Sequence, residues 1–277
     1  MIHEILPHHF NNQFIDAKHI HEEDYVLHYQ ENTILLKTNG DEFELPRKKD
    51  FPYLSDTIER SFLFKLNHVS CFLIWNHGEI NESKFIYKEI NFFRAFKKKE
   101  IAWICIVGFQ IMNWYTQNQY CGRCGSKTER KTNERSIVCN PCGTSIYPKI
   151  SPAIIVAIIC NDKILLASNS NFTSNWYSLV AGYVDIGESL EETVIREVKE
   201  EVGLDVFNIR YYKSQPWPYS GSMMIGFIAE ADDSQTIQID NKEITDAQWY
   251  TRDKLPNHPG NISIAGEMIE LFEKGEI

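Results

Sequence analysis

The segment from Gly182 to Leu204 constrains this chain more than any other, because it specifies both a helix and the charges carried on that helix. Ser189 followed by Glu192 is a capping-box pattern, and Gly203 stands where a left-handed residue ends a helix. The pattern therefore predicts a helix over residues 190–202. Its expected core-facing stripe consists of Leu190, Val194, Val198 and Val202.

Three glutamates lie beside this stripe. At about 100° per residue, Glu197 and Glu201 fall in one narrow sector next to the stripe, with Glu200 adjacent. One interpretation is a solvated acidic face, the usual role of charges on a helix. Like charges at this spacing repel, however, and holding them against a half-buried surface favours cations between them. Because hard oxygen ligands select Mg²⁺ or Mn²⁺, we predict a divalent metal site here.

Four cysteines form two close pairs upstream of this helix. Cys121 and Cys124 make one pair, Cys139 and Cys142 make the other, and fourteen residues separate the pairs. Four thiolates on two tight knuckles suit tetrahedral zinc, and no ligand position is left for water. We therefore predict a structural Zn²⁺ site, with two redox-active pairs as the alternative.

The composition narrows the choice of ligand and compartment. The net charge of -10 provides no general attraction for nucleic acid, so a small anionic ligand needs a local, metal-assisted site. No apolar run approaches the length of a membrane span, and the first ten residues lack a signal-peptide pattern. Seven cysteines, four of them closely paired, suit a reducing compartment. We predict a cytoplasmic protein.

Changes of pattern along the 277 residues predict three parts. They are a β-rich N-terminal domain (1–97), a linker helix with the zinc ribbon (98–146), and the domain that carries the glutamate helix (147–277). Helical spacing of apolar residues over Ile101 to Tyr120 predicts the linker helix. Two β-prone runs around Asn161-Asp162 predict a hairpin, which with the glutamate helix indicates an α/β sandwich on a mixed sheet.

Two motifs together resemble a known family. Residues 182–204 are similar to the Nudix box at every position that defines it. Just downstream, Ser214 to Pro218 read Ser-Gln-Pro-Trp-Pro, which looks like the signature of the NADH pyrophosphatase family, and that family carries a four-cysteine zinc ribbon before its Nudix domain. From about residue 94 onward, the chain therefore resembles the zinc-ribbon-containing NADH pyrophosphatase family of Nudix hydrolases.

The resemblance implies a fold, a reaction and an assembly. The fold is a Nudix α/β/α sandwich, and the reaction is metal-dependent hydrolysis of NAD(H) to AMP and nicotinamide mononucleotide. The expected catalytic residues and ligands of Mg²⁺ or Mn²⁺ are Glu197, Glu200, Glu201 and Glu243. Glu200 and Glu243 both remain candidates for the general base. A homodimer is also implied, and Arg196 is expected to neutralise Glu188 in a structural role.

The substrate is expected to meet a loop after the Nudix box. The candidate substrate-binding residues of this loop are Gln215, Pro216, Trp217, Pro218, Tyr219, Ser220, Gly221 and Ser222. Outside the loop, the family resemblance implies Tyr147, Ala181 and Ala265, with Arg94 a further candidate. Prolines stiffen this loop, while Trp217 and Tyr219 offer flat faces and Gln215 an amide for a purine or nicotinamide ring. The alternative for Trp217 is packing in a core. Ser220-Gly221 replace the family's usual proline, which loosens the loop.

Three other functions stay open. Removal of NAD caps from RNA uses the same bond, and a local patch of Lys97 to Lys99, Lys127, Arg130, Lys131 and Arg135 would assist it. The substrate could instead be ADP-ribose or another nucleoside diphosphate derivative. A non-catalytic Nudix ligand sensor would be expected to have damaged metal ligands, and none of the predicted ligands is damaged.

Overall fold

A computed structural model describes residues 1–17, 19–40, 42–51, 54, 58–77, 82–170, 176–239 and 242–277. These residues form two compact units. The C-terminal unit comprises Met1–Ile2, Ile150–Trp217 and Gly221–Ile277, and the N-terminal unit comprises His3–Lys149 and Pro218–Ser220. The finer division near residues 97 and 146 stays a prediction.

A mixed sheet of six strands forms the centre of the C-terminal unit. Its order is β15-β16-β12-β13-β17, with β14 paired to β12. The strands are β12 (Ser151–Cys160), β13 (Lys163–Asn169), β14 (Val180–Tyr183), β15 (Val206–Trp217), β16 (Ser222–Ala231) and β17 (Ile244–Thr251). Strands β12 and β16 run parallel, and the other pairs are antiparallel. Asn161, with φ of 52°, lies in the turn of the predicted hairpin.

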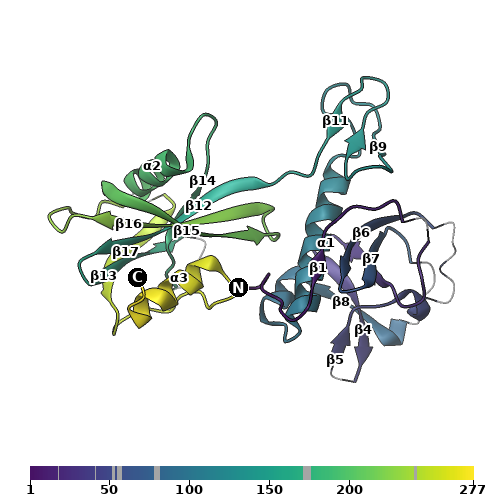
Figure 1. The fold of residues 1–277 in the computed structure, drawn as a ribbon, viewed down its shortest axis with the longest axis horizontal. Coiled ribbons are helices and arrows are strands. Elements are labelled where there is room, and N and C mark those ends of the chain that lie inside the picture. The colour runs from purple at the N-terminus through teal and green to yellow at the C-terminus, as the bar shows by residue number, and fades with distance from the viewer. Residues whose placement is uncertain are drawn as a thin grey trace. The chain divides into compact units, whose positions relative to one another are not determined.

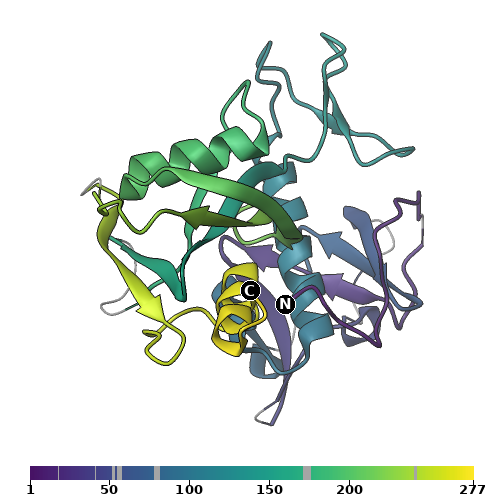
Figure 2. The same cartoon turned by 60° about the vertical axis from the view of Figure 1, so that its left-hand side comes forward.

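Two helices cover opposite faces of this sheet, as both views show (Figure 1 and Figure 2). Helix α2 (Leu190–Val202) buries Val194, Val198 and Val202 completely in the core on one face. Helix α3 (Ile264–Lys274) contributes its own buried residues to the core on the other face. Full burial of such side chains contributes about 1.5–3 kcal/mol each. The predicted α/β/α sandwich is confirmed.

The ends of α2 are those that the sequence predicts. The Ser189 side chain accepts a hydrogen bond from the Glu192 backbone N–H, and the Glu192 carboxylate accepts one from the Ser189 backbone N–H. Gly203 ends the helix in the left-handed conformation, with φ of 76°. Caps of this kind are worth about 1 kcal/mol each, so the register of the glutamates on α2 is fixed at both ends.

The N-terminal unit contains two four-stranded sheets and one long helix. The sheets have the orders β1-β6-β7-β2 and β3-β4-β5, with β8 paired to β4 in the second. Their strands are β1 (Phe10–Asn11), β2 (Tyr25–Leu27), β3 (Tyr29–Gln30), β4 (Thr33–Asn39), β5 (Glu42–Glu44), β6 (Arg60–Leu66), β7 (Val69–Ile74) and β8 (Phe85–Glu89). Three short 3₁₀ helices are η1 (Lys48–Asp50), η2 (Glu82–Lys84) and η3 (Ile90–Ala95). The β-rich character predicted for this region is confirmed.

Helix α1 (Lys99–Gln117) leads into the cysteine pairs. It ends before Tyr120, the predicted end, because Tyr120 already pairs with Lys127 in an isolated β-bridge at the start of the ribbon. The ribbon itself has three short antiparallel strands, β9 (Glu129–Arg130), β10 (Ile137–Val138) and β11 (Ser145–Ile146). In the part of the chain that the structure describes, no helix has both the length and the apolar character needed to cross a membrane.

Candidate active site

The glutamates of α2 differ sharply in their exposure. Glu201 is buried with 7% of its surface exposed, whereas the Glu197 side chain is 13% exposed and that of Glu200 is 60% exposed. The predicted position of Glu197 and Glu201 at the border of the core is therefore confirmed. Glu243 lies exposed, directly before β17. Hard carboxylate oxygens at the border of a core are a suitable donor set for Mg²⁺ or Mn²⁺.

Arg196 organises these carboxylates through one guanidinium group. Its Nε and Nη2 donate to the two oxygens of Glu188 at 2.5 and 2.9 Å, as predicted. Its Nη1 donates to Glu197 at 2.8 Å and to Glu200 at 3.0 Å, contacts that the sequence did not predict. A further bond from Nη2 to the Tyr183 carbonyl, at 3.0 Å, fixes the guanidinium against β14.

The pKa values of Glu188 and Glu197 shift in opposite directions, because a different cause dominates at each carboxyl group. Arg196, helped by the backbone N–H of Asp185, lowers the pKa of Glu188 to about 2. The stability gained from ionised Glu188 is therefore present above the ordinary carboxyl pKa and is lost as pH falls towards 2. Burial raises the pKa of Glu197, an effect that Arg196 opposes and that Glu200 and Glu243 reinforce. Glu243 thus lies close enough to act on Glu197, and a bound cation would relieve the repulsion.

The four glutamates are not gathered into one compact ligand set. Among the residues that the structure describes, only the four cysteines bring three or more ligand atoms of His, Cys, Asp or Glu together closely enough to hold a metal ion. Arg196 instead satisfies Glu197 and Glu200 directly. The metal-ligand role of the glutamates therefore stays a proposal, supported by their donor chemistry and burial.

Gly182 on β14 packs against the Glu197 carboxylate. A Cβ atom at position 182 would lie 1.9 Å from Cδ and 2.0 Å from Oε1 of Glu197. No side chain fits there unless Glu197 moves. The glycine at this position is thus explained by its close packing on the Glu197 carboxylate.

We expect Gly182→Ala to lower activity about 10- to 100-fold, because displacing a catalytic carboxylate by about 1 Å has an effect of this size. The fold should be retained, since only the end of one side chain must move. Steady-state rates over a Mg²⁺ titration measure the effect, with Gly122→Ala as the control, because a Cβ at position 122 meets nothing within 4 Å. Equal rates for the two variants would contradict a functional role for Glu197.

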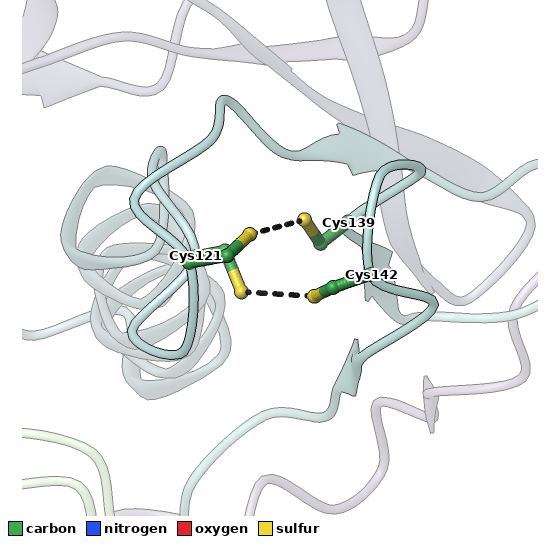
Figure 3. Close-up of side chains that lie close together, drawn as sticks. Cys121, Cys139 and Cys142 are labelled. Carbon is green, nitrogen blue, oxygen red and sulfur yellow. Dashed lines mark hydrogen bonds between the residues drawn. The ribbon is translucent and has the colours of Figure 1, made fainter.

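The four cysteine sulfurs of the ribbon converge. Figure 3 labels three of these residues, Cys121, Cys139 and Cys142. All four lie within 4.8 Å of one another, with Cys121 to Cys142 at 3.6 Å and Cys124 to Cys139 at 3.4 Å. A disulfide needs about 2.05 Å, whereas tetrahedral thiolates around zinc lie roughly 3.8 Å apart. Hydrogen bonds from Thr144 lower the pKa of Cys142 to about 6, which favours its thiolate. The geometry supports the predicted structural zinc site.

Several predicted substrate residues lie at the end of β15 in the C-terminal unit. Gln215 is fully buried there, and its amide is engaged by backbone: Nε2 donates to the Ile262 carbonyl at 3.0 Å, and Oε1 accepts from the Ile264 N–H at 2.7 Å. Gln215 thus anchors the first turn of α3 and presents no free amide group to a substrate ring. The C-terminal unit also holds Ala181, Pro216, Trp217, Gly221, Ser222 and Ala265.

The remaining predicted substrate residues belong to the N-terminal unit, which holds Tyr147, Pro218, Tyr219 and Ser220. The guanidinium of Arg94 lies 4.4 Å from the Tyr219 ring centroid, and burial raises the pKa of Tyr219 to about 12. Tyr147 is exposed, with its hydroxyl 3.4 Å from Glu134 Oε1. Arg94 and Tyr219, far apart in the sequence, therefore form one stacked pair.

The sequence analysis missed Tyr183 as a candidate. Its ring is 54% exposed, its hydroxyl lies 3.1 Å from Ser222 Oγ, and its carbonyl holds Arg196. It follows Gly182, which packs on Glu197. An exposed aromatic ring next to the predicted catalytic carboxylates is suited to contact a substrate. The Nudix box does not specify the residue at this position. The only sign of a substrate contact in the sequence is therefore the aromatic residue that follows Gly182.

The predicted basic patch is largely engaged in internal contacts. Arg130 pairs with Glu59 at 2.6 Å, and Lys131 pairs with Glu134 at 2.9 Å. Arg135 donates to the Leu63 carbonyl and to Asn12. These three cations therefore have partners within the N-terminal unit, and the role of the local basic patch in assisting RNA stays a proposal.

Comparison with known families agrees with this architecture. Residues 149–272 match the NUDIX domain, so the chain carries a Nudix domain in its C-terminal unit. Residues 117–147 match the NADH pyrophosphatase zinc ribbon domain, and residues 23–114 match the NADH pyrophosphatase-like rudimentary NUDIX domain. With these three domains in this order, the chain belongs to the NADH pyrophosphatase family of Nudix proteins. The last match extends the resemblance far upstream of residue 94, where the sequence analysis had placed its start.

Curated relatives match about three fifths of the chain. A protein named NAD-capped RNA hydrolase NudC from Pseudomonas aeruginosa is 42% identical over 170 residues, covering 61% of each chain. One of the same name from Pseudomonas fluorescens is 44% identical over 163 residues, covering 59% of each chain. The match thus spans about three fifths of the relatives' length. A Nudix hydrolase structure from Nitrosomonas europaea gives a TM-score of 0.49 at 18% identity, covering 57% of this chain and 92% of that one.

Proposed function

We propose that this protein hydrolyses the pyrophosphate bond of NAD(H), giving AMP and nicotinamide mononucleotide. The observation that carries the proposal is the pair of largely buried glutamates on α2, Glu197, which Arg196 contacts, and Glu201, in a Nudix domain. Carboxylates kept at the border of a core are suited to bind divalent cations together with a pyrophosphate. The match of the upstream domains to NADH pyrophosphatase domains supports NAD(H) as the substrate.

The mechanism follows from these charges. Glu197, Glu200, Glu201 and Glu243 would hold Mg²⁺ or Mn²⁺, which offsets the charge of the pyrophosphate and acidifies the attacking water when bound. Glu200 or Glu243, the more exposed carboxylates, accepts the proton of this water. The water oxygen forms a bond to one phosphorus while the bond from that phosphorus to the bridging oxygen breaks, and the other mononucleotide leaves.

Removal of NAD caps from RNA is a second candidate activity. It breaks the same bond, and the curated relatives carry the name NAD-capped RNA hydrolase. ADP-ribose and other nucleoside diphosphate derivatives remain alternatives on chemical grounds, because they share the pyrophosphate. A non-catalytic sensor is disfavoured by the intact set of Glu197, Glu200 and Glu201 on α2.

A substrate panel tests the proposal. The purified protein is incubated with Mg²⁺ or Mn²⁺ and with NADH, NAD⁺, ADP-ribose, diadenosine polyphosphates or NAD-capped RNA, and the products are separated by chromatography. We expect AMP and nicotinamide mononucleotide from NADH, and no turnover after chelation of divalent cations. Faster turnover of ADP-ribose than of NADH and NAD⁺ would refute the substrate assignment.

Tyr219→Ala should raise KM for NADH more than it lowers kcat, because a stacked ring is held in the ground and transition states alike. A stacking contact is worth about 1–3 kcal/mol, or roughly five- to a hundredfold. Tyr219→Phe, which keeps the ring beside Arg94, is the control. If the Tyr219 ring stacks on nicotinamide, the KM should rise for NADH alone. If it stacks on adenine, the KM should rise equally for NADH and ADP-ribose. Unchanged KM with both substrates would show that Tyr219 is scaffold.

We further propose a cytoplasmic homodimer. The dimer follows from the family resemblance, and the compartment follows from a zinc ribbon whose thiolates need reducing conditions. Light scattering coupled to size-exclusion chromatography measures the assembly, and a monomer at micromolar concentration would contradict it.

A further inference from the structure

A cavity of about 570 Å³ lies within the N-terminal unit, and two residues of the predicted basic patch, Lys127 and Arg130, line it. Its walls come from three separate parts of the chain. They are the zinc ribbon around Lys127 to Arg130, the last turns of α1 at Tyr115 and Gln119, and the β-rich region at Glu59 and Trp75. The volume falls in the range of about 300–1,000 Å³ that is usual for small-molecule sites.

Arg130 forms a flat platform in this cavity. Its guanidinium carbon lies 4.1 Å from the Trp75 ring centroid and 5.6 Å from that of Tyr115. The Trp75 and Tyr115 rings meet edge to face at 5.9 Å. Glu59 fixes the guanidinium from the side, with Arg130 Nη2 donating to Oε1 at 2.6 Å. The platform is thus pre-organised, and 29% of the Arg130 side chain remains exposed.

The cavity also offers polar groups at its rim. Within the described residues, the exposed side chains of Gln119 and Lys127 make no hydrogen bond or ion pair. An amide both donates and accepts, which suits the edge of a nucleobase. The formal charges of the lining residues cancel, because Lys127 and Arg130 are balanced by Glu59 and Glu129. The cavity is therefore suited to a flat, uncharged, polar-edged group more than to a phosphate.

We propose that this cavity binds an unstacked base of single-stranded RNA. Bases in unpaired RNA stack on aromatic rings and on guanidinium planes, and both surfaces are present together here. The inference rests on the proposed function, since it concerns the RNA chain of an NAD-capped substrate. In this proposal the ribbon helps to recognise the RNA chain that follows the NAD cap. Hydrolysis of NADH, which has no RNA chain, does not need this cavity.

Binding of an uncapped, fluorescently labelled single-stranded RNA, measured by anisotropy without divalent cations, tests the proposal. We expect Arg130→Ala to weaken binding five- to a hundredfold, the usual range for one stacked base. The matched control is Arg123→Ala, which removes an exposed ribbon cation that does not line the cavity. The loss with Arg130→Ala should be similar at low and high salt, because stacking is not an ion pair. The rate with NADH should stay within about twofold.

A second measurement does not depend on how the variants fold. RNA carrying 4-thiouridine is crosslinked to the parent protein, and the modified peptides are mapped. Crosslinks at Trp75, Tyr115 or residues 127–130 support the proposal, whereas crosslinks confined to other segments overturn it. Equal losses of binding with Arg130→Ala and Arg123→Ala would also overturn it, since they would indicate general attraction to phosphate. Failure of the parent protein to hydrolyse NADH would contradict the proposed function alone, because RNA binding is measured without turnover.

Discussion

Glu201→Gln is expected to lower kcat at least about 100-fold while the protein stays folded. A lost metal ligand removes several kcal/mol of transition-state stabilisation, and each 1.4 kcal/mol corresponds to a factor of ten. Glu201 is buried to 7% exposure, so replacing its charge by a neutral amide of the same shape leaves the core filled and removes one desolvated anion. Steady-state rates with NADH and thermal melting together separate loss of chemistry from loss of fold.

Glu191→Gln provides the matched control for this prediction. It is the same chemical change on the same helix, at an exposed position in the first turn of α2. Its only expected effect is a loss of about 0.3–1 kcal/mol of helix-dipole stabilisation. If Glu201→Gln keeps a rate within about threefold of the parent, Glu201 is not a metal ligand.

The second large effect concerns the ribbon, where Cys139→Ser should release the zinc and lower the melting temperature on the order of 10 °C. Cys139 is fully buried and lies 3.4 Å from Cys124 Sγ, and closed thiolate sites contribute directly to folding free energy. Zinc analysis by mass spectrometry and calorimetric melting measure the two changes. Activity should fall only to the extent that the protein unfolds.

Cys160→Ser is the control for the zinc prediction. Cys160 is also a buried thiol, but it ends β12 in the C-terminal unit and belongs to no cysteine cluster in the described residues. It should keep one zinc per chain and a nearly parental melting temperature. The prediction for Cys139 fails if the purified parent protein contains no zinc.

The parts of the fold that the sequence predicted are those with local signals. Capping residues and a 3.6-residue apolar period define α2 within thirteen residues, and two Cys-x-x-Cys pairs define the ribbon, so neither depends on distant contacts. The N-terminal region was read only as β-rich. Its rudimentary Nudix character was missed because the chain there lacks the box that makes the C-terminal domain recognisable.

The details of the site depend on tertiary contacts that the spacing of residues along the sequence does not reveal. An amide in a proline-rich loop predicts that Gln215 binds a base, yet its amide bonds to the backbone of Ile262 and Ile264, more than forty residues away. Likewise, the pairing of Arg130 with Glu59 joins residues 71 positions apart. Both sets of contacts depend on how distant segments of the chain pack together, which the sequence pattern does not show.

The contacts of the Arg196 guanidinium imply that the proposed divalent cations at α2 and the zinc of the ribbon bind in different ways. Because Arg196 already satisfies Glu188, Glu197 and Glu200, the acidic cluster carries an internal counter-ion and does not need a cation to remain folded. Divalent ions at α2 should therefore exchange readily with solvent, and the occupancy of their site should depend on the free cation concentration. The ribbon has no such substitute among its four sulfurs, so its zinc should be acquired once, during folding, and kept for the lifetime of the chain.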